Sequence, residues 1–547
     1  NGARGAAVAA HVVENRRMSV GRDDHLDQAK VREHSVYYWI KTSPGLEMME
    51  IPAYDVATVY GIPAGRVKEY CLSERQTEKD VMSLPWGMMS VILYSLVLLT
   101  HDAIPWLSSV ESAIAFDIEN NANFAFSDPL AMGHKNLADV NSPADFWSFM
   151  NKGFLPLVYP TDVWTSESSG LALGALESPR KDYYMLHLKK IGPLKVAKEN
   201  SPSIECPNTY IADIYNISCT ADANIDILLQ PTEFAVRNGG KFKEDRGSTQ
   251  WINGFGDDAK ALVKQLEQQV WVDTRTNHVK ASFLTYQADA DVLIMTHVNF
   301  LFSRAGRVWK LVTHTSLYLH PYGDFWMYII DILFYMRVTW IFAWELMEVI
   351  QTLIRNKNLW VAFNEYASFW NGVDWLFVTT AYVRLGLWIS RVVQVRDLEQ
   401  RLVGIPAEAL SCTTTTCGDF YGQLFVDIES AGHLVGTVRL LSGTLPIVIM
   451  LRVFKAFSAQ PRLALVTATL QGAFESLIHY LIVFSAIFLS YCVMAVALFG
   501  PEVGAFSTLD RAIPNCFRMI LGDFEFTQME MLGRGWAFFF FFTFMFM

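Results

Sequence analysis

The sequence predicts a polytopic α-helical membrane protein with a large α+β domain inserted, on the extracellular side, between its first and second spans. Two observations predict this class. First, the 547 residues are 52% hydrophobic and only 18% charged, whereas charged residues make up about a quarter of an ordinary soluble domain. Second, several stretches reach the roughly 20 apolar residues that cross a bilayer, and one polar stretch, residues 102–322, separates the first of them from the rest.

Six spans are expected. Their predicted ranges are Val81–Thr100, Phe325–Ile350, Phe369–Val392, Leu434–Phe457, Leu477–Phe499 and the start of a sixth, Trp536–Met547. A run as short as the last cannot cross a bilayer, so we expect this span to continue. The predicted division is a cytosolic tail (1–80), a first span (81–101), an extracellular domain (102–322), a voltage-sensor-like part with the second to fourth spans (323–457), and a pore part with the fifth span, the pore loop and the start of the sixth span (458–547).

Loop charge gives the orientation. The loop after the second span carries Arg355 and Lys357, and the fourth-to-fifth connection carries Arg452, Lys455 and Arg462 without an acid. Positively charged loops stay in the cytosol. This rule places the amino terminus inside and the large insert outside.

The insert has the features of an extracellular domain. It contains 19 Lys and Arg against 25 Asp and Glu, a net charge of −6. Its N-x-[ST] sequon, Asn216-Ile217-Ser218, is meaningful as a glycosylation site only on the outer or lumenal side. We therefore expect Asn216 to be glycosylated.

Cysteine spacing agrees with this compartment. The only two cysteines of the insert are Cys206 and Cys219, and an oxidising environment favours their pairing. Cys412 and Cys417, in the outer loop between the third and fourth spans, could form a second bridge. Cys71, Cys492 and Cys516 are expected to stay thiols, the last two as packing residues.

The insert is long enough to bury a core of its own. Trp271–Asp273 and Ala281–Tyr286 are predicted to be strands, and Asp257–Val270 is predicted to be an amphipathic helix. The combination favours an α+β domain.

The segment between the fifth and sixth spans carries the functional prediction. Ser507, with Asp510 three residues later, resembles a capping box, and a short helix is expected over Arg511–Leu521. An acidic loop follows, Gly522–Phe526. Non-helical backbone survives at membrane depth only where it lines protein or water, so two spans flanking these parts predict a re-entrant pore.

The predicted selectivity filter is Leu521, Gly522, Asp523 and Glu525. Rings of acidic side chains select cations, and in a tetramer Asp523 would supply four carboxylates that hold a permeating metal cation transiently. Glu525 would add four more near the outer mouth, and Gly522 would let the backbone turn sharply. Leu-Gly-Asp alone also fits an ordinary exposed loop, but its place between the last two spans favours the pore.

Several strings resemble the polycystin (TRPP) channels of the TRP superfamily, from about the first span to the end of the chain. They are Phe499-Gly500, Phe506-Ser507-Thr508, the string from Phe517 to Asp523 at the filter, the string from Phe369 to Asp374 in the third span, Trp271-Val272-Asp273 with Arg275 in the insert, and the thirteen-residue cysteine spacing. Glu525 is a departure, because family members often carry Asn or Asp there. We hypothesise that the added acid favours divalent cations.

This resemblance implies a six-span, voltage-gated-like TRP channel fold with the insert as the polycystin (TOP) domain, in a pore-forming polycystin-2-like subunit. It implies a homotetramer, or a heteromer with a polycystin-1-like subunit, whose extracellular domains pack as a lid above the pore. It also implies a non-selective cation conductance for Ca²⁺, Na⁺ and K⁺ without a bound cofactor. The family suggests a ciliary or flagellar membrane, the plasma membrane or the endoplasmic reticulum.

The fourth span raises the question of a voltage sensor. Arg452 and Lys455 lie on one helical face, and Arg439 lies further out; Asp374, Glu345 and Glu348 are candidate countercharges. Strong sensors repeat a basic residue at every third position, which this span does not do. The alternative is that Arg452 and Lys455 extend to the cytosolic interface. We expect weak voltage dependence at most.

A second function class stays open. An adhesion or scaffold subunit, whose extracellular domain binds a partner while the pore domain anchors it among the membrane lipids, fits the large outer domain equally well. The net charge of −11 argues against a nucleic-acid partner. The sequence contains no nucleophile elbow, zinc-ligand spacing or P-loop, so an enzyme is not expected.

Overall fold

The structure is a computed structural model. It describes residues 35–42, 45–52, 64–102, 104–125, 133–159, 183–185, 187–221, 242, 248–252, 257–356, 359–405, 415–457, 461–523, 526–530 and 533–546. The chain divides into two compact units, one formed by residues 86–453 and the other by residues 1–85 and 454–547.

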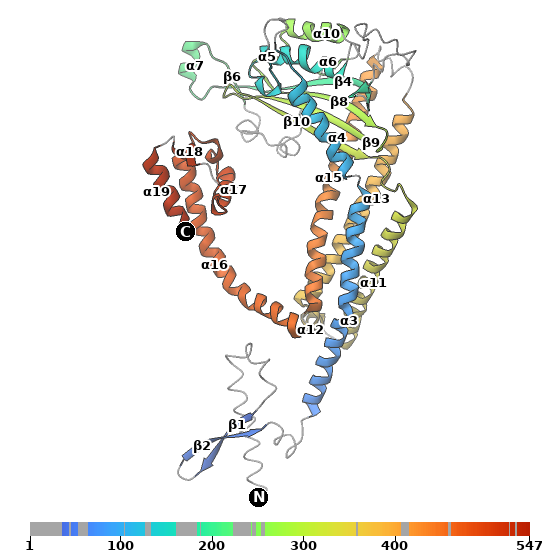
Figure 1. The fold of residues 1–547 in the computed structure, drawn as a ribbon, viewed down its shortest axis with the longest axis vertical. Coiled ribbons are helices and arrows are strands. Elements are labelled where there is room, and N and C mark those ends of the chain that lie inside the picture. The colour runs from blue at the N-terminus through green and yellow to red at the C-terminus, as the bar shows by residue number, and fades with distance from the viewer. Residues whose placement is uncertain are drawn as a thin grey trace, which may run out of the picture. The chain divides into compact units, whose positions relative to one another are not determined.

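Helices dominate both units (Figure 1). The α-helices are α3 (Ala64–His101), α4 (Ile104–Phe116), α5 (Pro143–Ser148), α6 (Leu155–Val158), α7 (Thr209–Tyr215), α10 (Asp257–Gln268), α11 (Phe325–Arg355), α12 (Leu359–Tyr366), α13 (Phe369–Val403), α15 (Thr415–Phe457), α16 (Pro461–Phe499), α17 (Leu509–Ile520), α18 (Phe526–Met529) and α19 (Arg534–Met545). Short π-helical turns lie at Asp117–Asn121 and Phe149–Phe154, and 3-10 turns at Leu137–Asp139 and Gly504–Phe506.

Within the residues that the structure describes, the strands form three antiparallel sheets. They are β1 (Ser35–Thr42), β2 (Gly45–Pro52), β3 (Tyr183–Tyr184), β4 (Leu188–Asn200), β5 (Ser203–Ile204), β6 (Cys219–Thr220), β7 (Gln250–Ile252), β8 (Thr276–Gln287), β9 (Val292–Phe302) and β10 (Val308–Tyr318). The main sheet has the order β10-β9-β8-β4-β3, with β7 also paired to β4, while β1 pairs with β2 and β5 with β6.

Five helical stretches among the described residues are long and apolar enough to cross a membrane. They are Leu84–Asn121, Phe325–Arg355, Phe369–Val403, Gly418–Lys455 and Gly472–Phe499. These five overlap the five complete spans expected from the sequence, and the main sheet lies between the first and second of them. The predicted class, a polytopic helical membrane protein with an inserted α+β domain, is confirmed.

The four spans of the first unit, α3, α11, α13 and α15, share one apolar core. Tyr94 of α3, Phe334 of α11, Phe377 of α13 and Leu445 of α15 are all buried in it. These side chains meet inside the bundle, whereas many large apolar residues on the other faces stay exposed. An apolar outer surface is the arrangement that a lipid environment favours.

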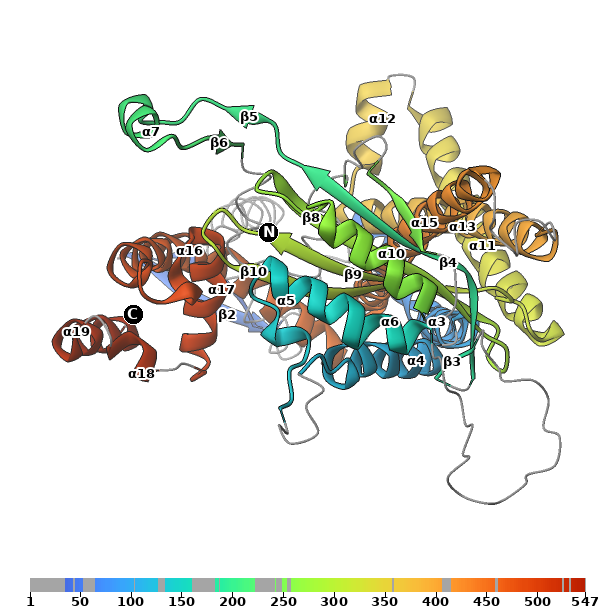
Figure 2. The same ribbon diagram turned by 90° about the horizontal axis from the view of Figure 1, so that it is seen from above.

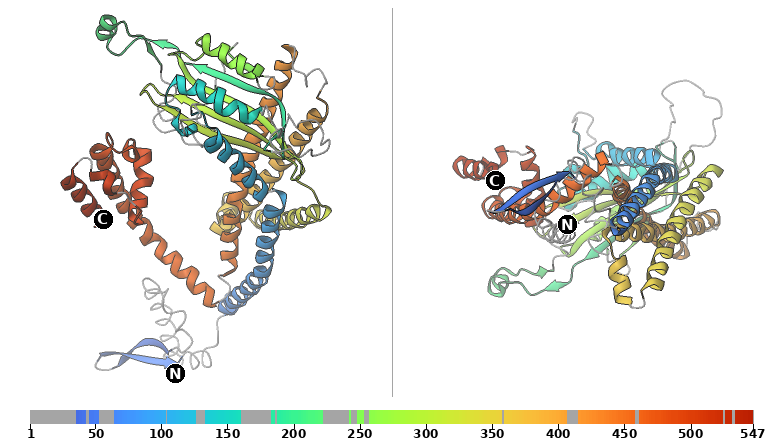
Figure 3. Two further views of the ribbon diagram at one scale, coloured as in Figure 1. Left: turned by 45° about the horizontal axis from the view of Figure 1, so that its top comes forward. Right: turned by 90° about the horizontal axis from the view of Figure 1, so that it is seen from below.

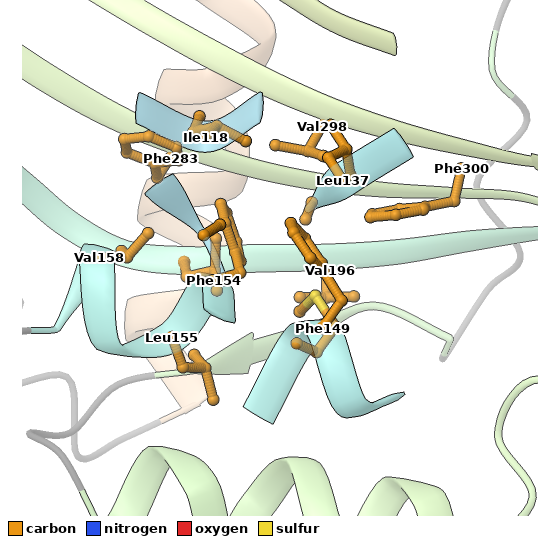
Figure 4. Close-up of a cluster of buried hydrophobic side chains, with 14 of the residues drawn as sticks. Ile118, Leu137, Phe149, Phe154, Leu155, Val158, Val196, Phe283, Val298 and Phe300 are labelled. Carbon is orange, nitrogen blue, oxygen red and sulfur yellow. The ribbon is translucent and has the colours of Figure 1, made fainter. Parts of the chain in front are cut away.

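The inserted domain packs helices on one face of the main sheet. Figure 2 shows α5, α6 and α10 lying over the long strands, and Figure 4 shows the contact itself, with Phe149, Phe154 and Val158 pointing toward strand residues Phe283 and Val298. All five of these side chains are 1% exposed or less. These buried aromatic and aliphatic side chains give the insert its own core, as its length predicts.

The opposite face of the same sheet is covered by the outer parts of α13 and α15. Successive side chains of a strand point to opposite faces, and β9 uses both: Ile294 packs in the core under α5 and α6, whereas Leu293 and Met295 pack against the outer part of α15. Tyr421 and Ile428 of α15 are fully buried in this second core. A strand covered on both faces is expected to be apolar on both, and β9 is so at its two ends, whereas its middle carries the buried polar residues Thr296, His297 and Asn299.

This second core explains why two helices extend beyond their predicted ends. The expected third span stopped at Val392 and the fourth began at Leu434, but α13 continues to Val403 and α15 starts at Thr415. Their outer segments carry too many charges to resemble membrane spans. Each still has an apolar stripe, for example Val395 and Leu398 in α13, which the sheet buries.

Two local predictions meet different outcomes. The amphipathic helix expected over Asp257–Val270 forms as α10, and Ala281–Tyr286 lies within β8. Trp271–Asp273, expected as a strand, is instead irregular and leads into a turn at Thr274 and Arg275. The Asp273 carboxylate accepts hydrogen bonds from the Arg275 N–H at 3.0 Å and the Thr276 hydroxyl at 2.9 Å, an Asx turn that competes with extended backbone.

A finger projects from the main sheet at β5, α7 and β6 (Figures 2 and 3). A disulfide between Cys206 and Cys219 closes it, which is the pairing that the sequence favours. Asn216 lies exposed at its tip, at the carboxyl end of α7. Of the second possible bridge, Cys412 lies outside the described residues, so that bridge stays a prediction.

Candidate functional site

The predicted pore loop starts where α17 ends. The Gly522 N–H donates to the Met519 carbonyl and the Asp523 N–H donates to the Arg518 carbonyl, both at 3.0 Å. These two bonds form the Schellman arrangement, which ends a helix at a residue with positive φ. Gly522 has a φ of +87°, a conformation that side chains disfavour. The chain therefore reverses at the glycine where the sequence predicts a sharp turn.

The guanidinium of Arg518 holds the side chain of Asp523. Its Nε lies 2.8 Å and its Nη2 2.6 Å from Oδ2 of the carboxylate. Both side chains are more than half exposed, 61% for Arg518 and 63% for Asp523. From the sequence we expected Asp523 to contribute to a ring of carboxylates, and Arg518 was not considered as its partner.

The other filter residues are less defined. Leu521 is 72% exposed and ends α17 as its C-cap residue. Glu525 lies outside the described residues. The structure thus brings Gly522 and Asp523 to the end of the pore helix together with Arg518, and the role of the whole set as a filter stays a prediction.

The predicted capping box at Ser507 does not form. The N-cap residue of α17 is Thr508, whose side chain makes no capping bond. The Ser507 hydroxyl instead donates to the Gly504 carbonyl at 2.9 Å and accepts from Arg511 at 3.1 Å. The Ser507 hydroxyl is thus bonded to the 3-10 turn before the helix and does not cap α17.

A compact apolar core supports α17 from behind. It joins α16, α17 and α19 through buried residues that include Phe499, Met519 and Phe540. Cys492 of α16 and Cys516 of α17 are fully buried free thiols in this core, as expected for packing residues. The loop end of α17 is thereby fixed on a rigid support while Asp523 stays accessible.

The second candidate site lies among the spans of the first unit. Nε of Arg452 lies 2.6 Å from Oδ1 of Asp374, and the Asp374 side chain is 2% exposed. Of the predicted voltage-sensor residues, the structure brings these two together. Arg439 is exposed, and Lys455 is half-buried.

The other acids proposed as countercharges have different surroundings. Glu345 is buried and accepts a hydrogen bond from the Tyr366 hydroxyl at 2.8 Å, whereas Glu348 is exposed. Arg337 of α11 is half-buried, with its guanidinium 5.4 Å from the ring centre of Trp86. Arg452 and Asp374 therefore form a short ion pair among the residues proposed for voltage sensing.

A polar network connects α3, α11 and α13 at the start of the inserted domain. Asp331 accepts from Tyr322 at 2.6 Å and lies 3.0 Å from His101 Nε2. The Trp388 indole donates to the Tyr322 oxygen at 2.8 Å. The pKa of Tyr322 is raised mainly by burial and further by the hydrogen bond to Asp331. The hydroxyl therefore keeps its proton and stays a donor.

Two arginines of α13 complete the junction. Arg391, 1% exposed, donates to Asp102 at 2.7 Å, and Arg384, 2% exposed, donates to Tyr335 at 2.8 Å and to Ser442 at 3.0 Å. Charges buried in this way are stable only with partners. Arg391 and His101 were not predicted from the sequence; the shared helical face of Arg384, Trp388 and Arg391 was the available signal.

Within the described residues, no cluster of three or more His, Cys, Asp or Glu side chains could hold a metal ion. The acid at the end of α17 is a single carboxylate per chain.

Comparisons with known proteins show what this chain is similar to. Residues 324–547 match the family model described as polycystin cation channel. Polycystin-2-like protein 1 of Homo sapiens is 21% identical over 412 residues, which cover 72% of this chain and 48% of that protein. Polycystin-2 of Danio rerio is 22% identical over 485 residues, covering 84% and 49%, and Polycystin-2 of Caenorhabditis elegans is 20% identical over 444, covering 75% and 55%. The chain spans about half the length of these curated relatives.

Proposed function

The chain belongs to the polycystin-2-like subfamily of polycystin cation channels, and from that premise we propose that it is a pore-forming subunit of a tetrameric, non-selective cation channel permeable to Ca²⁺, Na⁺ and K⁺. The observation that carries the proposal is the position of Asp523, accessible at the carboxyl end of α17, in a segment between the apolar helices α16 and α19.

Two electrostatic contributions favour cations at this position. The carboxyl end of a helix carries a partial negative charge, and four copies of α17 would direct four such ends at one axis. The Asp523 carboxylates would add a ring of acid, the arrangement that selects cations. In this proposal Glu525 forms a second acidic ring near the outer mouth.

We also propose that the inserted domains of the four chains pack together as a lid above the pore. Within this chain, helices cover both faces of its main sheet. The finger, by contrast, exposes Tyr210, Ile214 and Tyr215, each 60% exposed or more. Exposed apolar groups of this kind favour contact with another protein. That partner would be a neighbouring copy in a homotetramer, a polycystin-1-like subunit in a heteromer, or an extracellular ligand of an adhesion subunit.

The test is cation current through the full-length protein in a planar bilayer. Wild type is compared with Asp523→Asn and Glu525→Gln, and Asp510→Asn is the matched control because Asp510 lies at the other end of α17. We expect Asp523→Asn to reduce Ca²⁺ permeation most, Glu525→Gln to reduce it less, and Asp510→Asn to behave as wild type. Size-exclusion chromatography with light scattering verifies that each variant is tetrameric.

The outcomes separate the two function classes. Loss of Ca²⁺ permeation in an intact Asp523→Asn tetramer supports the channel. If wild type carries no current under calcium, voltage or tension, the adhesion or scaffold function takes its place, and the finger becomes the region to study. Family membership is also the basis for expecting a ciliary, plasma or endoplasmic-reticulum membrane, which immunolocalisation distinguishes.

A further inference from the structure

The acid of the predicted filter carries its own cation. Arg518 and Asp523 are five residues apart, and the Schellman turn at the end of α17 brings their backbones together through the 3.0 Å bond between the Asp523 N–H and the Arg518 carbonyl. The guanidinium then reaches the carboxylate with two N–H groups, at 2.6 and 2.8 Å. The turn that places the acid at the pore loop therefore also places the arginine beside it.

We propose that Arg518 is a specificity-determining residue, a tethered cation that competes with permeating divalent ions for the Asp523 carboxylate and so keeps the filter non-selective. This inference rests on the proposed channel function. A bare ring of four carboxylates would attract divalent cations strongly. With one guanidinium bound to each carboxylate, the net charge of each pair is zero.

The exposure of the pair makes this competition possible. Both side chains are more than 60% exposed, and ion pairs in contact with water are weak and exchange readily. A buried pair would neutralise the acid permanently. An exposed pair opens when a cation arrives, at the cost of separating the carboxylate from its guanidinium.

The geometry also explains why arginine suits this position. A guanidinium presents several donors in a rigid fork, and here two of them converge on one oxygen, Oδ2. A lysine would keep the charge but would lose the paired contact. We therefore expect a graded series, in which Arg518→Lys lies between wild type and Arg518→Gln.

The experiment measures how much Ca²⁺ blocks half of the Na⁺ current through the full-length channel. We expect Arg518→Gln to lower this concentration by about tenfold or more, because it removes a unit positive charge a few ångströms from the carboxylate, and to raise the permeability ratio of Ca²⁺ to Na⁺. Arg511→Gln is the matched control, since Arg511 lies in the same helix and contacts Ser507 instead. It should give the wild-type value.

A double variant separates the proposed role from a structural one. If Arg518 acts through Asp523, then Arg518→Gln added to Asp523→Asn causes no further shift in Ca²⁺ block. A second test uses Arg518→Cys, where a positively charged methanethiosulfonate should restore the wild-type value and a neutral reagent should not. A wild-type channel treated with the same reagents controls for the other thiols of the chain, among which Cys71 is exposed.

The results distinguish this inference from the proposed function. Ca²⁺ block that is unchanged in a conducting Arg518→Gln channel overturns the inference and leaves the channel function standing. The inference also fails, and the channel function stands, if Arg518→Gln shifts the block equally with and without Asp523. A wild-type protein that never conducts overturns both. If Arg518→Gln does not assemble, the Arg518→Lys and Arg518→Cys arms decide.

Discussion

Arg452 and Asp374 form a short ion pair between the fourth and third spans, with Nε and Oδ1 2.6 Å apart. The Asp374 side chain is 2% exposed and that of Arg452 is 20% exposed, so the pair lies largely inside the helix bundle. The sequence left open an alternative in which Arg452 extends to the cytosolic interface. The contact with Asp374 places its guanidinium against α13, and the depth of this pair relative to the membrane interface stays a prediction.

The pair predicts a characteristic pattern of stability. Replacing one partner of a buried ion pair leaves the other charge without compensation and costs about 3–5 kcal/mol. We expect Asp374→Asn and Arg452→Gln each to lower the thermal stability of the purified protein by several degrees. The double variant should lose less than the sum, because it leaves no unpaired charge.

Fluorescence-detected size-exclusion chromatography after heating measures this effect, and Arg439→Gln is the control, because Arg439 lies exposed on the same helix. Additive losses in the double variant would contradict the pairing.

The contact between α15 and the main sheet predicts opposite effects for two glycines one helical turn apart. A Cβ atom on Gly432 would lie 2.2 Å from Cγ2 of Thr315 in β10, whereas one on Gly436 would meet nothing within 4 Å. Thr315 is β-branched and has little freedom to move away. We expect Gly432→Ala to destabilise by about 1–3 kcal/mol through overpacking. Gly436→Ala should be neutral or stabilise by up to about 1 kcal/mol through helix propensity.

Thermal stability of the two single variants, measured side by side, checks this prediction. Equal effects would mean that α15 does not pack closely on the sheet at Gly432.

These two contacts also mark how far the sequence could predict the structure. Hydropathy located the five complete spans because a bilayer imposes one length and one composition. It could not locate the outer ends of α13 and α15, since Val395 and Leu398 become buried only once the sheet, formed more than 70 residues earlier in the chain, lies against them. The apolar stripe of these segments is local, but the sequence does not show which distant element will cover it.

The candidate site divides in the same way. The reversal at Gly522 was predictable, because a glycine after a helix is a local signal. The contact of Arg518 with Asp523 depends on a side-chain direction that the sequence does not specify. The Arg391 and Asp102 pair joins residues far apart in the chain. Spacing within one helix indicated the polar face of α13, but not its partners.

The finger predicts glycosylation at Asn216. This residue is exposed and adopts a φ of +51° as the C-cap of α7, a left-handed conformation that asparagine tolerates better than most residues. Asn216→Gln should remove the glycan and strain this cap at the same time. Ser218→Ala should remove the glycan alone, because it breaks the sequon and leaves Asn216 in place.

We therefore expect both variants to gain the same electrophoretic mobility as wild type treated with an N-glycosidase, and only Asn216→Gln to increase hydrogen exchange in residues 209–217. Unchanged mobility in Ser218→Ala would show that the sequon is not used.

The amino terminus of α5 predicts an acid-sensitive contact in the inserted domain. Ser142 is its N-cap: the hydroxyl accepts from the Asp145 N–H at 3.1 Å and donates to the Asp145 carboxylate at 2.8 Å. The hydrogen bond from Ser142 is the main reason that the pKa of Asp145 is lowered. A lowered pKa in the folded state contributes stability above the unfolded value of about 3.9, and this contribution is lost as the pH falls below it.

Ser142→Ala should therefore cost about 1 kcal/mol at pH 7 and should weaken the further loss of stability on acidification. Hydrogen exchange of residues 143–158, corrected for intrinsic rates and compared at pH 7 and about pH 3.5, measures both effects. Ser148→Ala, at the other end of α5, is the matched control and should follow wild type at both pH values. If Ser142→Ala and wild type lose protection equally on acidification, the hydrogen bond from Ser142 is not what lowers the pKa of Asp145.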